Sequence, residues 1–230
     1  MEHQPPGATE RTRLRRLPEK ATADRAEVYR VLDAGRLAHV AVVGDRSGRK
    51  ASLPGLDDPG QPYVVPVAYG RDGDRVLFHG STGSRLFRAL AYGAPTCFTV
   101  TLLDGLVLAR SAFESSMNYR SVMVLGHCVE VAAADKLAAL ETVSEHLMPG
   151  RWADIRPPTS KELAATMVLA LPLAECSAKI STGDPTDDPA DLDRPTWAGV
   201  IPIRTVLGPP VPAADLRAAT PAPGYLEDWL

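Results

Sequence analysis

Residues 75–92 have the sequence Arg-Val-Leu-Phe-His-Gly-Ser-Thr-Gly-Ser-Arg-Leu-Phe-Arg-Ala-Leu-Ala-Tyr. This pattern predicts a short apolar strand over 76–78, a break at Gly80 and Gly83, and a helix that starts near Arg85 with one apolar side. Between strand and helix lies a loop of small, hydroxyl-bearing and cationic residues, 79–85. The rest of the predicted fold is arranged around this strand–loop–helix unit.

The composition of the loop fits phosphate binding. Backbone N–H groups are unpaired at a helix start, the helix dipole favours an anion, and Arg85 adds a full positive charge. The hydroxyl groups of the loop can each donate a further hydrogen bond. The loop is neither a Walker loop nor a complete Gly-x-Gly-x-x-Gly motif. The alternative is an ordinary turn in which Ser84 caps the helix.

Composition limits the possible classes of protein. The chain has 230 residues, of which 45% are apolar and 23% charged, and its net charge is −3. Such values are typical of a globular protein. No apolar run approaches the roughly 20 residues of a membrane span, and the N-terminus lacks the apolar region of a secretory signal. We therefore expect a cytoplasmic protein with no membrane partner.

Two further sets of residues, a basic cluster and three cysteines, have ordinary structural interpretations. A basic cluster lies near the N-terminus, at Arg11, Arg13, Arg15 and Arg16. Because the chain is slightly acidic and no nucleic-acid-binding fold follows, we expect a solvated or partner-contacting arm and no nucleic-acid partner. Three cysteines lie in apolar, strand-like sequence, at Cys97, Cys128 and Cys176. We expect buried reduced thiols, and we propose no metal site.

Strand signals dominate the chain outside the 75–92 unit. We expect strands over 37–43, 62–69, 96–103, 105–111, 119–131 and 167–180. Turn signals at 71–74 and at Asp104-Gly105 predict two hairpins, and 44–60 is a long polar loop. Helices are expected over 23–34, ended by Gly35, over 135–147, and after the capping box at Thr159.

This order of elements predicts a mainly β protein, a six- to seven-stranded antiparallel Greek-key barrel with short flanking helices. We expect an N-terminal arm over 1–22, the barrel domain over 23–182, and an extended tail over 183–230. The tail is rich in Pro, Asp and Gly and should pack on the barrel or on a partner subunit.

With the strands placed, the chain resembles the FMN-binding split β-barrel of the pyridoxamine 5′-phosphate oxidase-like superfamily. Within that superfamily it is most similar to the nitroimidazole-resistance (Nim-like) flavoproteins. The resemblance is carried by an ordered set of stretches: 11–16, 35–38, 62–69, 77–81, 116–122 and 197–200. It implies a homodimer that holds FMN at the subunit interface.

The resemblance also implies a set of cofactor-binding residues: Pro66, Val67, Ala68, His79, Gly80, Ser81, Thr82, Ser84, Arg85, Asn118, Tyr119, Arg120, Ser121 and Trp197. The residues at 66–68 would border the flavin ring, and the loop at 79–85 would surround the phosphate. Residues 118–121 would face the ring or phosphate from a neighbouring strand, and Trp197 would close the site.

The expected function is that of an FMN-dependent oxidoreductase that reduces a small organic substrate, such as a nitro or quinone-like compound, with NAD(P)H or another reductant upstream. No C-terminal Arg-x-His clamp is present, which disfavours pyridoxamine 5′-phosphate oxidation. His79 is the candidate catalytic residue, because a histidine beside the flavin can donate protons near neutral pH. The alternative is that His79 only hydrogen-bonds the phosphate or the backbone.

Other readings of the sequence stay open at this point. The barrel of this superfamily also takes haem, and His79 or His127 would then be the axial ligand of a haem-binding or haem-degrading protein. A non-catalytic flavin-binding protein and the deazaflavin cofactor F420 are further alternatives. The sequence does not decide whether the insert at 45–61 covers the site or projects into solvent.

Overall fold

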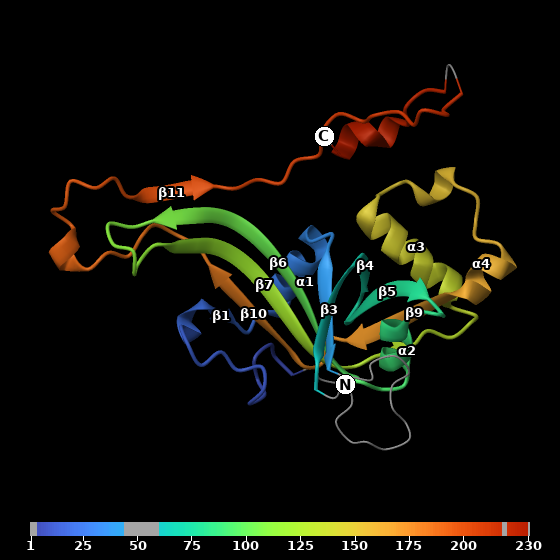
Figure 1. The fold of residues 1–230 in the computed structure, drawn as a ribbon, viewed down its shortest axis with the longest axis horizontal. Helices are drawn as coiled ribbons and strands as arrows, with labels where there is room; N and C mark the ends of the chain where they lie inside the picture. Colours follow the sequence, from blue (N-terminus) through green and yellow to red (C-terminus); the bar gives the residue numbers. More distant parts are fainter. Residues whose placement is uncertain (1–3, 44–59, 218–219, 230) are drawn as a thin grey trace.

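The structure is a computed structural model that describes residues 4–43, 60–217 and 220–229. Almost all of the loop predicted over 44–60, and with it the insert at 45–61, lies outside these residues. The described chain forms eleven strands, all paired antiparallel, in two sheets with short helices around them (Figure 1). The prediction of a mainly β, antiparallel split-barrel fold is confirmed, and the barrel does not close.

The larger sheet has the strand order β1-β10-β7-β6-β2-β3, and β11 pairs with β6. Its strands are β1 (Ala21–Thr22), β2 (Ala38–Val43), β3 (Pro62–Val67), β6 (Pro95–Leu108), β7 (Ser116–His127), β10 (Cys176–Ser181) and β11 (Gly199–Pro202). The smaller sheet has the order β4-β5-β9-β8. Its strands are β4 (Tyr69–Asp72), β5 (Arg75–Ser81), β8 (Val129–Glu130) and β9 (Thr166–Pro172).

The helices begin and end where local chemistry predicts. They are α1 (Arg25–Ala34), α2 (Arg85–Ala91), α3 (Lys136–Leu147) and α4 (Ser160–Ala165), with short 3-10 turns η1 (Pro18–Lys20), η2 (Trp152–Asp154), η3 (Pro189–Asp191) and η4 (Gly224–Trp229). The Asp24 side chain accepts from the N–H of Ala26 at the start of α1, and Gly35 caps its end. Thr159 and Glu162 form the predicted capping box of α4.

Two apolar layers lie on either side of β5. Phe78 faces the main core, where its ring centroid lies 5.9 Å from that of Phe98 and 5.7 Å from that of Phe87. Leu77 faces the opposite side and packs in a second cluster with Leu140 of α3. Because side chains alternate along a strand, His79 lies on the same side as Leu77, toward α3.

The strand in the 75–92 unit is longer than predicted. The sequence suggested a break at Gly80, but β5 continues to Ser81 and pairs with β9 along its whole length. Gly80 is required for a different reason: a Cβ at this position would overlap the Phe87 ring of α2. The glycine therefore lets helix and strand pack closely and does not make a turn.

The hairpin predicted at Asp104-Gly105 is wrong. β6 runs without a turn from Pro95 to Leu108, and the register with β7 shifts between Leu103 and Gly105, which is the signature of a bulge. A Cβ at Gly105 would lie 3.1 Å from the carbonyl oxygen of Ile201 in β11. Gly105 thus makes room for the tail strand.

Three other predicted strands are each divided between the two sheets. The strand expected over 119–131 is β7 and β8. The strand expected over 167–180 is β9 and β10, separated by a short turn after Pro172. The strand expected over 62–69 ends at Val67, and Tyr69 already belongs to β4 of the smaller sheet. In a split barrel the chain crosses between sheets at such points, so a continuous apolar run does not mean one strand.

None of the three cysteines forms a disulfide bond in the described chain. Cys128 and Cys176 are buried, Cys97 is half-buried, and all three are free thiols. Among the described residues, every helix is too short or too polar to cross a bilayer.

Candidate functional site

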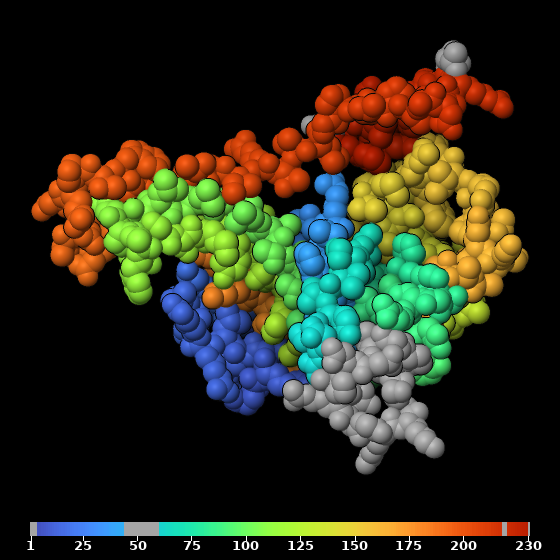
Figure 2. All heavy atoms as spheres, in the orientation of Figure 1, coloured from blue at the N-terminus to red at the C-terminus, as the bar shows by residue number. Residues whose placement is uncertain are grey.

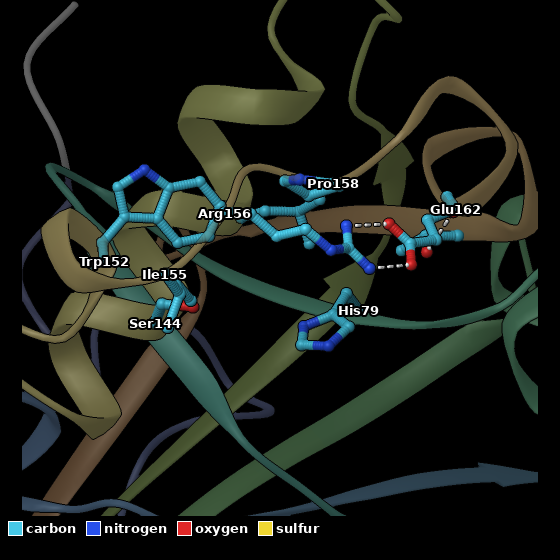
Figure 3. A pocket seen from close by; sticks show the side chains of 9 residues that line it. His79, Ser144, Trp152, Ile155, Arg156, Pro158 and Glu162 are labelled. Atoms are coloured by element: carbon cyan, nitrogen blue, oxygen red, sulfur yellow. Dashed lines mark hydrogen bonds and ion pairs between the residues drawn. The ribbon is translucent and has the colours of Figure 1, made fainter. Parts of the chain in front are cut away.

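A pocket of about 430 Å³ lies between the smaller sheet and the helices that cover it. It is lined by His79 of β5, Leu140 and Ser144 of α3, Trp152 of η2, Ile155, Arg156 and Pro158 of the following loop, and Glu162 and Thr166 at the two ends of α4. Figure 3 shows the His79 ring and the Arg156 guanidinium facing the same space. We call this cavity the His79 pocket.

The imidazole of His79 is the chemically distinctive group of the pocket. β5 pairs with β9 at His79 and Val168, which fixes the backbone and directs the ring to the α3 side. Within the described part of the chain, the ring makes no hydrogen bond. The ring is accessible through the pocket opening, yet the surrounding protein lowers its pKa below the ordinary 6.5 by desolvation. At neutral pH the ring is therefore neutral, with a nitrogen lone pair available.

An ion pair forms one rim of the pocket. Arg156 donates two hydrogen bonds to Glu162, at 2.8 and 2.7 Å. Glu162 also accepts from the backbone N–H of Thr159 at 2.7 Å. These bonds, chiefly those from Arg156, lower the pKa of the Glu162 carboxyl to about 2. Both side chains therefore stay charged over the physiological pH range, and their ion pair holds the Arg156 guanidinium at the pocket opening.

The other walls are largely apolar, with Leu140, Trp152 and Ile155 around a cavity whose size is typical of small-molecule sites. A neutral imidazole with a free lone pair, surrounded by apolar walls, is a suitable ligand for a haem iron. A cation at the rim suits the acidic groups of such a molecule. The chemistry of this lining suits a flat, apolar group that carries an acidic edge.

Of the predicted phosphate loop, 79–85, only His79 lines this pocket, and residues 80–85 follow outside its lining. The backbone of the loop is partly engaged: the N–H of Thr82 donates to Ala165 at 3.0 Å and that of Ser84 donates to Ser81 at 2.9 Å. The Ser81 hydroxyl accepts from the N–H of Gly83 at 3.1 Å. Ser84 occupies the N-cap position without a side-chain capping bond, and Arg85 is exposed at the start of α2. A helix start lacks intrahelical partners for its first-turn N–H groups, so an anion at the start of α2 would meet hydrogen-bond donors there.

The residues predicted to border the flavin ring lie at a sheet edge. Among the described residues β3 ends the larger sheet, so they supply no further strand at its outer edge in that sheet. Pro66 is exposed, Val67 is buried, and Ala68 stands between β3 and β4. An edge strand is what backbone contact with a flavin ring requires.

The residues predicted on β7 and the tail lie elsewhere. Their part of β7 belongs to the far end of the long β6–β7 hairpin, well away from β5 and α2 (Figure 1). Arg120 donates to both oxygens of Asp104, at 2.9 and 2.8 Å, and the Asn118 amide donates to the carbonyl of Gly183 at 2.9 Å. The Ser121 hydroxyl makes only a long bond, of 3.5 Å, to the carbonyl of Lys179.

Tyr119 is half-buried next to these groups, and the side chain of Trp197 in the tail is 66% exposed. Asn118 lines a second pocket of about 590 Å³ that also contains Lys20 and Phe113. A single chain thus does not bring the β7 residues to His79 or to the loop before α2.

His127, the other histidine considered as a haem ligand, has a structural environment. Its Nδ1 lies 2.9 Å from the carbonyl oxygen of Gly93, and it borders a pocket of about 250 Å³ together with Cys97. That volume is below the usual range for a cofactor site. The structure therefore favours His79 over His127.

The covering residues of the His79 pocket were missed at the level of sequence. Trp152 and Arg156 lie between two predicted helices and belong to no strand. The available signal was the capping box at Thr159, which places Glu162 in the first turn of α4. Nothing local indicated that α3 and α4 would meet over β5.

Comparison with known proteins gives a consistent result. The sequence profile of the family described as pyridoxamine 5′-phosphate oxidase matches residues 24–180. The chain is 40% identical to the FAD and haem binding protein from Mycobacterium smegmatis, with a TM-score of 0.83, over 91% of this chain and 97% of that one. It is also 40% identical to the flavocytochrome Anf3 from Azotobacter vinelandii, with a TM-score of 0.84, over 96% and 97%.

A candidate 5-nitroimidazole antibiotic resistance protein from Bacteroides thetaiotaomicron is 19% identical, with a TM-score of 0.54, over 70% of this chain and 86% of that one. At this identity the likeness is one of fold alone. No curated protein matches the sequence.

Proposed function

The chain belongs to the pyridoxamine 5′-phosphate oxidase family, and we propose that it is a redox protein that binds a flavin and, in the His79 pocket, a haem. Flavins transfer hydride or single electrons, and haem iron transfers single electrons or binds small ligands. The protein supplies the pockets, the orientation and the local electrostatics.

The His79 ring carries the haem part of the proposal. It is neutral and without a hydrogen bond among the described residues, in a cavity of about 430 Å³ with apolar walls. The support from relatives is that two 40% identical proteins are named for haem or as a flavocytochrome. As an axial ligand His79 would give its lone pair to iron, and the Arg156 rim would lie near an acidic edge of the macrocycle.

The flavin part rests on family membership and on the names of the same two proteins. The sequence predicts FMN, and the relative named for FAD makes FAD the flavin that we propose. Arg85 and the first turn of α2 would receive a flavin phosphate, and the β3 edge would border the ring. F420 remains an alternative that the same experiment decides.

A homodimer is part of the proposal. The predicted flavin-binding residues form two groups, one at the β3–β5 side and one on the β6–β7 hairpin, which a single chain keeps apart (Figure 1). A second copy that supplies the hairpin residues would complete the site. Reduction of a small organic substrate, such as a nitro or quinone-like compound, is the activity that we propose for the open face of the flavin.

Mass spectrometry of the small molecules that the purified protein releases on denaturation tests this function. We expect FAD together with haem, after expression with a haem precursor. FMN without haem would instead support the flavin-only reductase predicted from the sequence. Protein that is colourless and binds no flavin or haem on titration would refute the proposal.

A further inference from the structure

The end of the chain folds back onto the loop that follows α3. The indole Nε1 of Trp229 donates to the carbonyl oxygen of Pro149 at 3.1 Å, and Arg151 donates to the Tyr225 hydroxyl at 3.0 Å. The Tyr225 and Trp229 rings pack together with their centroids 5.5 Å apart. We call residues 224–229 the C-terminal hook.

The loop is shaped to receive this hook. Gly150 has φ +81°, a left-handed conformation that favours glycine. A Cβ at Gly150 would lie only 3.3 Å from the Cβ and Cγ atoms of Tyr225. The tyrosine ring therefore packs against bare backbone, in a contact that other residues at position 150 would disturb.

The same loop carries a wall of the His79 pocket. Glu145 of α3 accepts from the backbone N–H of Gly150 at 2.7 Å and from that of Trp152 at 2.8 Å. The Trp152 side chain lines the pocket. The loop is thus held by α3 through Glu145 and by the hook through Pro149, Gly150 and Arg151.

A restrained segment delivers the hook to this place. β11 is anchored on β6, and the N–H of Ile203 donates to Asp104 at 2.9 Å. Residues 204–217 are exposed, with Val206 at 80% and Val211 at 89%, and cross from the β6–β7 hairpin to the α3 side (Figures 1 and 2). Three prolines at 209, 210 and 212 limit the freedom of this segment, so less entropy is lost when the hook docks.

We propose that Tyr225 and Trp229 are positioning residues, which hold the 149–152 loop and its Trp152 side chain in the conformation that walls the His79 pocket. The expected effect on haem affinity rests on the proposed function, whereas the expected effect on the 149–152 loop is independent of it.

Hydrogen–deuterium exchange of the full-length protein tests the effect on the loop. In Tyr225→Ala/Trp229→Ala, we expect peptides covering 149–156 to exchange about tenfold faster, because two hydrogen bonds to the loop are lost, while peptides of β5 and β9 are unchanged. The matched control, Val206→Ser/Val211→Ser, changes the same tail at exposed positions and should match wild type. Equal exchange in the hook variant and wild type would overturn the proposal.

If the double variant does not fold, Tyr225→Phe gives the same comparison, since it keeps the ring on Gly150 and removes only the bond from Arg151. Its loop should exchange faster than that of wild type, and no change would overturn the proposal.

Haem titration followed by the Soret band tests the consequence for the pocket. The hook variant should bind haem about tenfold more weakly, with flavin affinity unchanged. Unchanged haem affinity beside faster loop exchange would overturn the claim that the hook positions the haem wall. Wild-type protein that binds no haem would refute the proposed function, and the exchange comparison would still decide the role of the hook.

Discussion

The His79 ring can serve as an iron ligand or as a proton donor, but not as both at once. A ligand uses the lone pair of the neutral ring, whereas an acid that donates a proton near neutral pH is the protonated imidazolium. Desolvation lowers the pKa of His79 and so favours the neutral form. The geometry favours the ligand, because the ring faces the His79 pocket and the rest of the predicted phosphate loop, residues 80–85, does not line that pocket.

Replacement of this side chain separates the two histidine candidates. His79→Ala should abolish the Soret band on haem addition, since the proposed axial ligand is lost. His127→Ala is the matched control and should bind haem like wild type, because its ring is bonded to Gly93 beside a smaller pocket. Haem titration of both variants is the measurement, and loss of binding in His127→Ala alone would reverse the assignment.

The pH dependence of haem binding follows from the same pKa shift. Protons compete with iron for the His79 lone pair, and the pKa in the folded protein lies below 6.5. Haem affinity should therefore stay constant from pH 8 to about 6.5 and fall only at lower pH, as protonation sets in. The unfolded chain binds this proton more readily, so unfolding also becomes easier on acidification through the same window. An affinity that already falls above pH 7 would contradict this assignment.

Arg85 is the residue whose replacement tests the flavin part of the proposal. If its guanidinium makes a charge-assisted hydrogen bond to a flavin phosphate, Arg85→Ala should weaken flavin binding by about 1.5–3 kcal/mol. Arg88→Ala, in the last turn of the same helix, is the matched control and should have little effect. Fluorescence titration with FMN and FAD gives both dissociation constants. An unchanged dissociation constant in Arg85→Ala would show that this side chain does not contact the flavin phosphate.

At the scale of elements, the contact between β5 and α2 decides how the 75–92 unit folds. Gly80→Ala would place a methyl group against the Phe87 ring, and overpacking of this kind costs about 1–3 kcal/mol of unfolding free energy. Gly83→Ala is the control, because its Cβ would meet only the Ser81 hydroxyl at an ordinary 3.5 Å. Urea unfolding of both variants measures the difference. Equal stability would mean that α2 moves away from β5 without cost.

The sequence predicted which segments are strands or helices better than it predicted how they connect. Helix ends followed from local chemistry, such as Gly35 and the capping box at Thr159. The hairpin predicted at Asp104-Gly105 is wrong because Gly105 lies at a bulge of β6 that pairs with β11. This pairing joins residues nearly a hundred positions apart in the sequence. Long-range pairing of this kind leaves no local pattern.

The candidate site shows the same limit. His79 was identified from its place in the 75–92 unit, and the structure puts its ring into a pocket. Trp152 and Arg156 were missed because they line that pocket only after α3 and α4 pack over the smaller sheet. The Asn118–Ser121 segment was identified by resemblance alone, and the role that we propose for it depends on a second copy of the chain.

At the scale of the whole molecule, the two sheets create two different surfaces, which we propose as the two cofactor sites. The smaller sheet and its helices line the open His79 pocket within one chain. The β3 edge and the β6–β7 hairpin offer open surfaces that two copies would join. On our proposal, this division would give each cofactor its own place, haem in the His79 pocket and flavin at the interface.

The absorption spectrum of the purified protein after haem is added tests this account most directly. We predict a Soret band and flavin bands in the same preparation, at one haem and one flavin per chain. A flavin spectrum that excess haem leaves without any Soret band would contradict the central claim that the His79 pocket is a haem site.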